Sequence, residues 1–265
     1  MGNSVDISIQ RVLPQPKSRF LVFIRAGDSV EFDYWSESKR RNWDVAISSY
    51  GEEELSRQLY AEADYLFMGG LSKMQSFKRF YEAAPQIKAY DAILMLDNDI
   101  DIDPDDLANF FELHCEHGFS ISQPALSHDS NSNFDLTLRY PMTIYRKTTY
   151  VEVMAPCFSQ EAINKTIQTF DETISGWGMD LVWPLLVPDK SIGVIDLCVM
   201  RHTAPMDAVN GPFYQYLKSI GVHPIIELEG ICKKYNIDRF SYPLGNLVVN
   251  SQTLHVRFGR PKPKS

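Results

Sequence analysis

Two aspartates separated by one residue follow the most apolar segment of the sequence. Ala92–Leu96 reads AILML and runs directly into Asp97, Asn98 and Asp99. Alternate residues after a strand can turn two carboxylates towards one point, and such carboxylates repel each other unless a cation lies between them. This spacing therefore predicts a site for a hard divalent ion such as Mg²⁺ or Mn²⁺, held by the carboxylates and by phosphate oxygens of a ligand.

Three rival patterns also place aspartates close together in a sequence. An EF-hand loop needs Gly at its sixth position and Glu at its twelfth, which this segment lacks. A phosphatase of the haloacid-dehalogenase type also has Asp-x-Asp after an apolar strand, with the first aspartate as nucleophile, but Asp101 stands where that motif usually carries Thr or Val. The third pattern is a solvated turn leading into a helix, with Asp103 as N-cap and Pro104 in the first helical position; Asp101, Asp105 and Asp106 fit it.

A second segment, Gly176–Asp180, reads GWGMD and joins a glycine-rich loop to a carboxylate. Asp180 begins a short predicted helix, so it is either an ordinary N-cap or a base placed to accept a proton from a hydroxyl group. Trp177 offers a flat face to a sugar ring, although tryptophan is more often part of a core. His202 follows the apolar run Ile192–Val199 and is either a structural histidine or a third metal ligand at a strand end.

The elements that would position these residues predict an α/β fold with a mixed, mostly parallel central sheet flanked by helices. Strands are predicted at Phe20–Ile24, Trp43–Ser48, Tyr65–Met68, Ala92–Leu96, Tyr150–Ala155 and Ile192–Val199. Helices are predicted over Glu52–Glu62, after the N-caps Ser72, Asp103 and Ser159, and over Tyr214–Ile220 and Ile225–Tyr235. In such folds ligands bind at the carboxyl ends of the strands, where two polar loops, Arg25–Ser29 and Asp97–Asp103, are expected.

Composition excludes several classes of protein. The chain has 265 residues, of which 44% are hydrophobic and 23% charged, as in soluble globular proteins. No apolar run approaches the ~20 residues of a membrane span, and residues 1–10 lack the apolar region of a secretory signal. The four cysteines are widely spaced, which predicts free thiols in a reducing compartment and hence a cytoplasmic protein.

Charge is distributed unevenly along the chain. The net charge is −8, and Asp97–Asp106 holds six aspartates with no Lys or Arg. No basic face suited to duplex nucleic acid is visible. The basic residues at the end of the chain, which allow a weak peripheral contact with an anionic membrane surface, are Arg257, Arg260, Lys262 and Lys264.

Taken together, these motifs resemble the nucleotide-sugar-dependent glycosyltransferases of the GT-A fold. Those enzymes carry Asp-x-Asp after a buried strand, many add Gly-Trp-Gly ending in an acidic residue, and some have a late histidine as third metal ligand. The residues that match in this order are Asp97, Asp99, Asp180 and His202.

A closer resemblance is to a large family known only as a domain of unknown function. It covers most of residues 18–205, and its blocks here are Ser122–Leu126, Glu152–Pro156 followed by Phe158 and Ser159, and Gly176–Asp180. The resemblance implies a GT-A-like, Rossmann-like catalytic domain over residues 18–205. Its nucleotide and metal half is 18–120 and its acceptor half 121–205, with an N-terminal extension (1–17) and a C-terminal helical extension (206–265) packed on the same domain.

The resemblance also implies roles for individual residues. Asp97, Asp99 and His202 would bind Mn²⁺ or Mg²⁺. The donor nucleotide would meet Arg25, Asp28, Lys73, Asp97 and Asn98, of which Arg25, Asp28 and Lys73 could instead be surface charges. The acceptor would meet Glu152, Trp177 and Gly178, and Glu152 could instead support the site.

The implied reaction is transfer of a sugar from a nucleoside diphosphate sugar to a glycan or glycolipid acceptor, in polysaccharide biosynthesis. A UDP-sugar is the expected donor because that nucleotide is the most common one. Asp180 as base implies inversion; if it only orients the acceptor, retention stays open. The alternatives are a metal-dependent phosphatase or phosphotransferase with Asp97 as nucleophile, and a non-catalytic carbohydrate-binding module.

Overall fold

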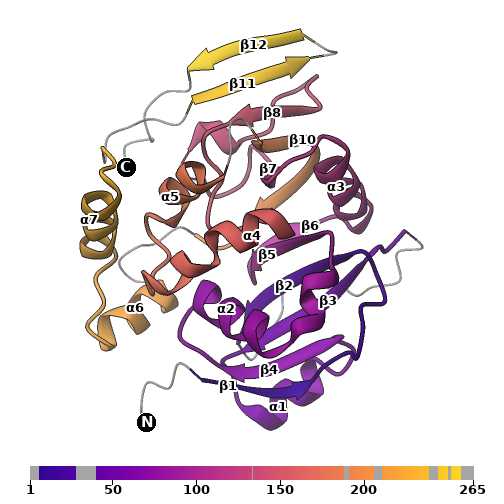
Figure 1. Cartoon of the computed structure of the whole chain (residues 1–265), viewed down its shortest axis with the longest axis vertical. Helices are drawn as coiled ribbons and strands as arrows, with labels where there is room; N and C mark the ends of the chain where they lie inside the picture. The colour runs from indigo at the N-terminus through magenta and orange to yellow at the C-terminus, as the bar shows by residue number, and fades with distance from the viewer. Residues whose placement is uncertain are drawn as a thin grey trace.

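The computed structural model describes residues 6–27, 40–132, 134–187, 191–205, 211–238, 244–249 and 252–257 (Figure 1). The strands are β1 (Ile7–Arg11), β2 (Phe20–Ala26), β3 (Trp43–Ser49), β4 (Tyr65–Gly69), β5 (Ala92–Asp97), β6 (Ile100–Ile102), β7 (Ile121–Leu126), β8 (Tyr145–Thr148), β9 (Cys157–Ser159), β10 (Ile192–His202), β11 (Leu244–Val249) and β12 (Gln252–Arg257). The α-helices are α1 (Glu53–Leu59), α2 (Lys73–Ala83), α3 (Pro104–Glu116), α4 (Gln160–Thr166), α5 (Met179–Leu186), α6 (Pro212–Ser219) and α7 (Pro224–Tyr235). Short 3₁₀ helices are η1 (Pro85–Ala89), η2 (Asp135–Thr137) and η3 (Ile167–Asp171).

The strands of the described residues form one 12-stranded mixed sheet. Its order is β1-β4-β3-β2-β5-β9-β7-β10-β8-β11-β12, and β6 pairs with the carboxyl end of β10. The sheet extends from β1 at the bottom of Figure 1 to the β11–β12 hairpin at the top. β4, β3, β2 and β5 are parallel to one another, and so are β7 and β10. The predicted fold class is therefore confirmed.

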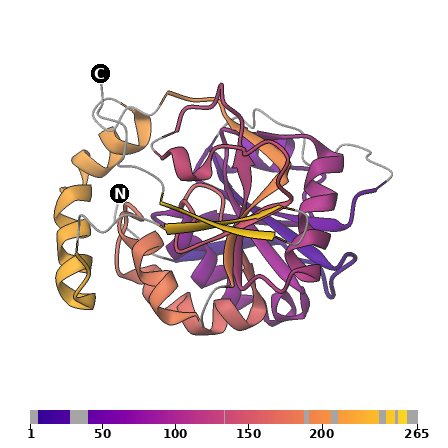
Figure 2. The same ribbon diagram turned by 90° about the horizontal axis from the view of Figure 1, so that it is seen from above.

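The parallel strands are buried on both faces, which explains their continuous apolar sequences. Along β2, Phe20, Val22 and Ile24 join the core on one face, where α3 packs with Leu107, Phe110 and Phe111. The alternate residues of β2, Leu21 and Phe23, join the core on the other face, with α2, α4 and α5. Figure 2 shows helices on both sides of the sheet, α7 at the left and α3 at the right. The result is a three-layer arrangement with the sheet in the middle.

Helix boundaries follow the caps read from the sequence. Ser72 accepts a hydrogen bond from the backbone N–H of Gln75 at the start of α2. Asp103 accepts from two backbone N–H groups at the start of α3, with Pro104 as first helical residue. Ser159 caps α4 through the N–H of Ala162. These caps confirm the predicted starts of three helices.

One predicted strand is wrong. The chain from Tyr150 to Ala155 forms no strand and lies between β8 and the short β9. The hydroxyl of Thr148 bonds to both the N–H and the carbonyl of Tyr150, which turns the chain. The carbonyls of Val153 and Met154 then accept hydrogen bonds from a lysine side chain, described below, and that of Met154 also accepts from the backbone N–H of Asp97 in β5. Side-chain bonds to Thr148 and to the lysine thus interrupt a regular ladder here, although single main-chain bonds to β5 remain.

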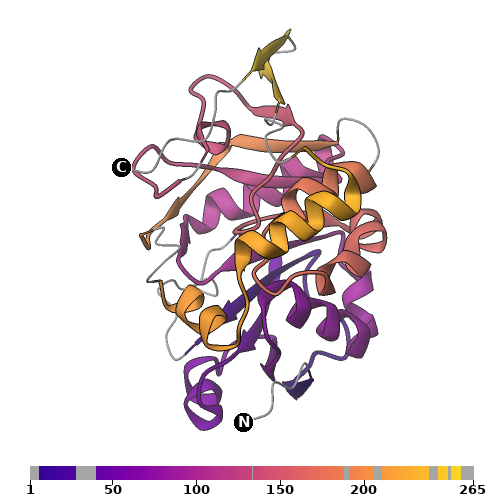
Figure 3. The same cartoon turned by 90° about the vertical axis from the view of Figure 1, so that its left-hand side faces the viewer.

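Both expected extensions contain strands. Residues 1–17 include β1, which pairs with β4 and so belongs to the sheet. Residues 206–265 contain α6 and α7 as predicted, but also the β11–β12 hairpin, which pairs with β8, so this extension is not only helical. Figure 3 shows α6 and α7 crossing the flank of the molecule one after the other. Arg260, Lys262 and Lys264 lie outside the described residues.

Two expectations from composition are met by the described residues. All four cysteines are free; Cys157, Cys198 and Cys232 are buried and Cys115 is partly buried. No helix in the described ranges has both the length and the apolar character that crossing a membrane requires.

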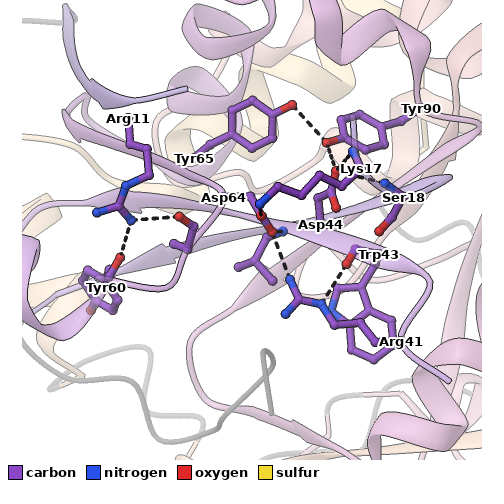
Figure 4. A network of polar contacts seen from close by, with 12 residues as sticks. Arg11, Lys17, Ser18, Arg41, Trp43, Asp44, Tyr60, Asp64, Tyr65 and Tyr90 are labelled. Carbon is purple, nitrogen blue, oxygen red and sulfur yellow. Dashed lines mark hydrogen bonds and ion pairs between the residues drawn. The ribbon is translucent and has the colours of Figure 1, made fainter. Parts of the chain in front are cut away.

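A buried polar network lies at the amino-terminal ends of the parallel strands (Figure 4). Asp44 accepts hydrogen bonds from Tyr90, at 2.6 Å, and from the backbone N–H groups of Lys17 and Ser18. Asp64 pairs with Lys17 at 2.8 Å and with Arg41 at 2.9 Å. This network ties the segment before β2 to the sheet, at the end of the strands opposite to Asp97.

Candidate functional site

The site begins where the parallel strands end. Asp97 is the last residue of β5 and lies opposite Arg25 of β2 in the parallel register. The apolar residues before it are fully buried, whereas the Asp97 side chain is 43% exposed. The strand therefore carries its first carboxylate out of the core at the edge of the sheet where ligands of such folds bind.

Lys73, the first residue of α2, holds this carboxylate. Its Nζ lies 2.6 Å from Oδ1 of Asp97 and donates to the carbonyls of Val153 and Met154, at 2.7 and 2.9 Å. An ammonium group has three N–H donors, and all three are used. Because the Lys73 side chain is only 8% exposed, it is not a surface charge. It joins the end of β5 to the segment at Val153 and Met154.

Asp99 and His202 form a second ion pair beside the first. Nε2 of His202 lies 3.1 Å from Oδ2 of Asp99. The antiparallel pairing of β6 with β10, in which His202 lies opposite Ile100, brings together these residues from distant parts of the chain. Nδ1 of His202 lies 3.1 Å from the carbonyl of Asn131, which can only accept, so Nδ1 carries a proton and Nε2 is directed at Asp99.

The local charges favour a protonated imidazole at this position. Burial lowers the pKa of His202, but the hydrogen bond to Asp99 and the charges of Asp99 and Asp97 outweigh it, so the pKa is raised. In the absence of another cation, the imidazolium balances Asp99 while Lys73 balances Asp97. The carboxylates of the Asp-x-Asp motif are each paired with a cationic side chain.

The residue types at this edge fit a divalent ion. Oδ1 of Asp99 is buried and has no hydrogen-bond partner, so one ligand atom is left without a bond. His202 has the hydrogen-bonded Nδ1 that usually accompanies a metal-ligating Nε2. Within the ranges that the structure describes, however, no three His, Cys, Asp or Glu side chains gather closely enough to hold a metal as they stand. Oδ1 of Asp97 is instead paired with Lys73.

Asp180 stands on the other side of the site, in the first turn of α5. The N-cap of this helix is Gly178, at φ +90°, so Asp180 is not the N-cap. Oδ2 of Asp180 accepts a hydrogen bond of 2.9 Å from the hydroxyl of Tyr150. Burial raises the pKa of Asp180 to about 6, although the bond from Tyr150 and backbone N–H groups oppose the rise. A carboxylate with a pKa near the working pH suits a general base.

Glu152 is a second buried carboxyl group near Asp180. It is 4% exposed, and its side chain accepts a hydrogen bond from the hydroxyl of Thr137. Burial raises the pKa of Glu152 to about 7, and the charge of Asp180 contributes to the rise. Its backbone N–H donates to Oε1 of Gln123 at 2.5 Å. Residues from the blocks Ser122–Leu126, Glu152–Pro156 and Gly176–Asp180 thus meet around one pair of acids.

Arg25 makes contacts within its own chain. Its guanidinium donates four hydrogen bonds of 2.8–2.9 Å, to the hydroxyls of Ser48 and Ser76 and to the carbonyls of Gly69 and Gly70. Burial lowers the pKa of Arg25 to about 10. Arg25 therefore fixes the loop that leads from β4 into α2, the helix whose first residue is Lys73.

The other predicted nucleotide contacts are less informative. Asn98 lies partly exposed in the turn between β5 and β6. Asp28 lies outside the described residues. A direct contact of either residue with a nucleotide stays a prediction.

The Gly-Trp-Gly loop is fixed from outside by the C-terminal helices. Trp177 donates through Nε1 to the hydroxyl of Tyr214 in α6, at 3.3 Å, and the two rings pack edge to face. Glu227 of α7 accepts hydrogen bonds from the backbone N–H groups of Ile174 and Ser175, both at 2.8 Å. Burial, with a smaller contribution from the charge of Asp97, raises the pKa of Tyr214, so this ring lies within electrostatic range of the β5 carboxylate.

Several residues of this site are not predicted by the sequence. They are Gln123, Asn131, Thr137, Tyr150 and Tyr214. Tyr150 lies in an irregular segment and Thr137 ends the three-residue 3₁₀ helix η2, so no periodic pattern marks which of these side chains face inwards. Tyr214 lies in a helix that the sequence predicts, but nothing in the sequence places that helix against Trp177.

Comparison with known proteins adds one finding. Residues 71–149 match the family model described as Protein of unknown function (DUF707). None of the curated proteins matches the chain. The match supports the likeness to a widespread family of unknown function and carries no activity with it.

The DUF707 segment contains the Asp-x-Asp motif of the site. It runs from the N-terminus of α2 to the end of β8 and includes Lys73, Asp97 and Asp99. Glu152, Asp180 and His202 lie beyond it. The DUF707 match thus covers Lys73 and the two aspartates of the Asp-x-Asp motif, while the fold adds the remaining residues from the later part of the chain.

A surface hollow of about 560 Å³ lies beside the β6–β10 ladder and is separate from this site. Its lining includes Asp101, Asp129 and Arg201, but not Asp97, Asp99 or His202. Since neighbouring residues of a strand face opposite sides of the sheet, Arg201 and His202 point in different directions. The hollow therefore takes no part in the arrangement described above.

Proposed function

We propose that this protein is a metal-dependent glycosyltransferase that moves a sugar from a nucleotide-sugar donor to a glycan or glycolipid acceptor. The observation that carries the proposal is the unpartnered, buried Oδ1 of Asp99 beside the oriented Nε2 of His202. Together with Asp97, these atoms supply the hard and borderline ligands that Mn²⁺ and Mg²⁺ accept. They lie at the edge of a Rossmann-like sheet where phosphorylated ligands bind.

The donor side consists of residues that handle negative charge. Bound at Asp97, Asp99 and His202, Mn²⁺ or Mg²⁺ would supply charge neutralisation for a nucleoside diphosphate leaving group. Lys73 holds Asp97 in place and adds a fixed positive charge beside it. Arg25 orients the loop that leads into α2, the helix whose first residue is Lys73. Uridine diphosphate is the favoured nucleotide of the donor.

The acceptor side contains the base. Asp180, with its pKa near 6, accepts the proton of the acceptor hydroxyl as that oxygen attacks the anomeric carbon. Attack by a deprotonated acceptor from the face opposite the leaving group inverts the anomeric configuration. Trp177 and Gly178, which precede Asp180 in the chain, would contact the acceptor, and Glu152 lies close enough for the charge of Asp180 to act on it. A cytoplasmic location, with the basic C-terminal residues contacting an anionic membrane that carries a glycolipid acceptor, belongs to the same proposal.

One contact favours a second candidate function. Lys73 at 2.6 Å from Asp97 is an arrangement that would also stabilise an aspartate nucleophile in a metal-dependent phosphatase or phosphotransferase. In that reaction Asp97 would attack a phosphate monoester and form an aspartyl phosphate. Asp180 would then have no necessary role, which separates the two candidates.

The test of the proposal is donor turnover. UDP-, GDP-, CMP- and dTDP-sugars are incubated with the protein, Mn²⁺ and mixed glycan or glycolipid acceptors, and nucleotide release is measured. We expect one donor class to be used only with Mn²⁺, and Asp180→Asn to reduce the rate by about 10²–10⁴-fold. The matched control is Asp91→Asn, which removes an exposed carboxylate paired with Arg19 and should leave the rate unchanged.

Two results would point elsewhere. Hydrolysis of p-nitrophenyl phosphate with an acid-stable phosphoryl adduct that is lost in Asp97→Asn would support the phosphatase. Sugar binding that survives both chelation of metal and Asp180→Ala, without turnover of any donor, would support a carbohydrate-binding module.

A further inference from the structure

Tyr150 is a buried phenol placed directly against the proposed base. It is 4% exposed, and its hydroxyl donates to Oδ2 of Asp180 at 2.9 Å. In the part of the chain that the structure describes, no other side chain donates a hydrogen bond to Asp180; its further bonds come from backbone N–H groups of the first turn of α5. The orientation of this carboxylate therefore depends on one side chain.

The ring of Tyr150 is held on several sides. Its centroid lies 4.9 Å from that of Phe134, and it packs in a small apolar cluster with Leu136 and Leu181. Its own backbone N–H and carbonyl both bond to the hydroxyl of Thr148, at 3.3 and 2.7 Å. Backbone and ring are thus both fixed, so the hydroxyl has little freedom to leave Asp180.

A fully buried ion pair supports the loop over this ring. Arg146 and Asp196 are both 0% exposed and lie 2.9 Å apart. Arg146 also donates to the carbonyls of Leu136 and Leu138, and Asp196 accepts from the backbone N–H of Tyr140. Residues 136–140 are therefore anchored at three backbone atoms.

The anchored loop serves both acids of the site. It carries Leu136, which packs on Tyr150 beside the preceding Phe134, and it carries Thr137, whose hydroxyl bonds to Glu152. Asp180 faces two titratable side chains, the phenol of Tyr150 and the carboxyl of Glu152. Burying an ion pair costs desolvation free energy. Here the pair fixes the segment that contacts both Tyr150 and Glu152.

We propose that Tyr150 is a positioning residue: its phenol fixes the carboxylate of Asp180 in the orientation and ionisation that proton transfer requires, and the loop anchored by Arg146 and Asp196 keeps it there. The meaning of this contact for catalysis rests on the proposed glycosyltransferase function. The contact itself and its effect on Asp180 do not, so they can be tested without any substrate.

The test is the titration of Asp180 in Tyr150→Phe. Protein labelled with ¹³C at the Asp carboxyl groups is titrated by NMR, and the Asp180 signal is assigned by its absence in Asp180→Asn. The phenol stabilises the ionised form, so its removal should raise the pKa of Asp180 by about one unit, a tenfold change in the proton equilibrium. The substitution leaves the ring volume unchanged, so the thermal midpoint serves only to show that the fold is intact.

The matched control is Tyr65→Phe. Tyr65 is also fully buried and hydrogen-bonded, to Tyr90 at 3.0 Å, but at the opposite end of the strands. Tyr65→Phe should leave the pKa of Asp180 unchanged. An unchanged titration in a folded Tyr150→Phe, or equal shifts in both variants, would overturn the inference. A shift in Tyr150→Phe alone, in a protein that turns over no nucleotide sugar, would keep the inference and reject the proposed function.

Discussion

At the scale of single residues, the site contains two kinds of carboxyl group. Burial raises the pKa of two of them, and cationic side chains pair with the other two. Neither Asp180 nor Glu152 belongs to one of the two ion pairs, and burial raises their pKa values to about 6 and about 7. Asp97 and Asp99 instead face Lys73 and His202. Acids with different surroundings can take different roles in one site, one as ligand and one as base.

Glu152→Gln should change how stability depends on pH. Because the pKa of Glu152 is raised from 4.5 to about 7 in the folded protein, its proton stabilises the fold at low pH. This contribution is lost as pH rises through 7. Relative to Glu152→Gln, the wild type should therefore lose roughly 2–3 kcal/mol of unfolding free energy between pH 5 and pH 8. Urea unfolding of both proteins at the two pH values measures this difference.

Two outcomes of that experiment would contradict the prediction. Parallel pH dependence in wild type and Glu152→Gln would mean that Glu152 titrates as in the unfolded chain, contrary to the raised pKa. A wild type that gains stability relative to the variant as pH rises would contradict the sign.

At the scale of elements, the site depends on pairings that join distant parts of the chain. The sequence alone predicts the end of β5, and hence the place of Asp97 and Asp99, because a buried apolar run stops there. It also predicts a strand ending near His202. It does not predict that β6 pairs with β10, since a three-residue strand carries no recognisable period.

The irregular segments account for the other differences between sequence and structure. The run from Tyr150 to Ala155 alternates enough to suggest a strand, but Lys73 binds two of its carbonyls and Thr148 turns its start. Such bonds depend on tertiary contacts that no local pattern contains. Tyr150 and Tyr214 belong to the site for the same reason, and their roles become visible only in three dimensions.

Gly178→Ala should test whether α7 restricts the turn before α5. Gly178 has φ +90°, and an added Cβ would lie 3.0 Å from Cγ2 of Ile231 in α7. Both the backbone strain and the contact oppose substitution, because L-residues rarely adopt this conformation. Gly118, at φ +63° with nothing within 4 Å of an added Cβ, supplies the control. Gly178→Ala should cost at least about 1 kcal/mol more than Gly118→Ala in urea unfolding; equal costs would show that α7 does not restrict this turn.

At the scale of the whole molecule, the two ends of the parallel strands differ. The amino-terminal ends carry the network of Asp44, Asp64 and their partners, in which each carboxylate has several donors (Figure 4). At the carboxyl-terminal ends, Asp99 keeps a buried oxygen without a partner. A satisfied network stabilises the fold, whereas an unsatisfied atom beside an oriented histidine is expected where a ligand binds.

The most direct measurement of the proposed donor site is thermal unfolding with Mn²⁺ and a panel of UDP-, GDP-, CMP- and dTDP-nucleotides, each alone and combined with the metal. We expect one nucleotide to raise the midpoint only when Mn²⁺ is present. At 100 times the dissociation constant, the gain is about 2.7 kcal/mol, or roughly 5 °C or more.

The matched variants are Asp99→Asn and Asp101→Asn. Both remove one charge from the same acidic segment, but Asp101 lies 4.0 Å from Arg201 and lines the separate surface hollow. Asp99→Asn should abolish the metal-dependent shift, and Asp101→Asn should retain it. A nucleotide shift that ignores Mn²⁺, an equal loss in both variants, or no shift with any nucleotide would contradict the claim that Asp97, Asp99 and His202 form a metal-dependent donor site.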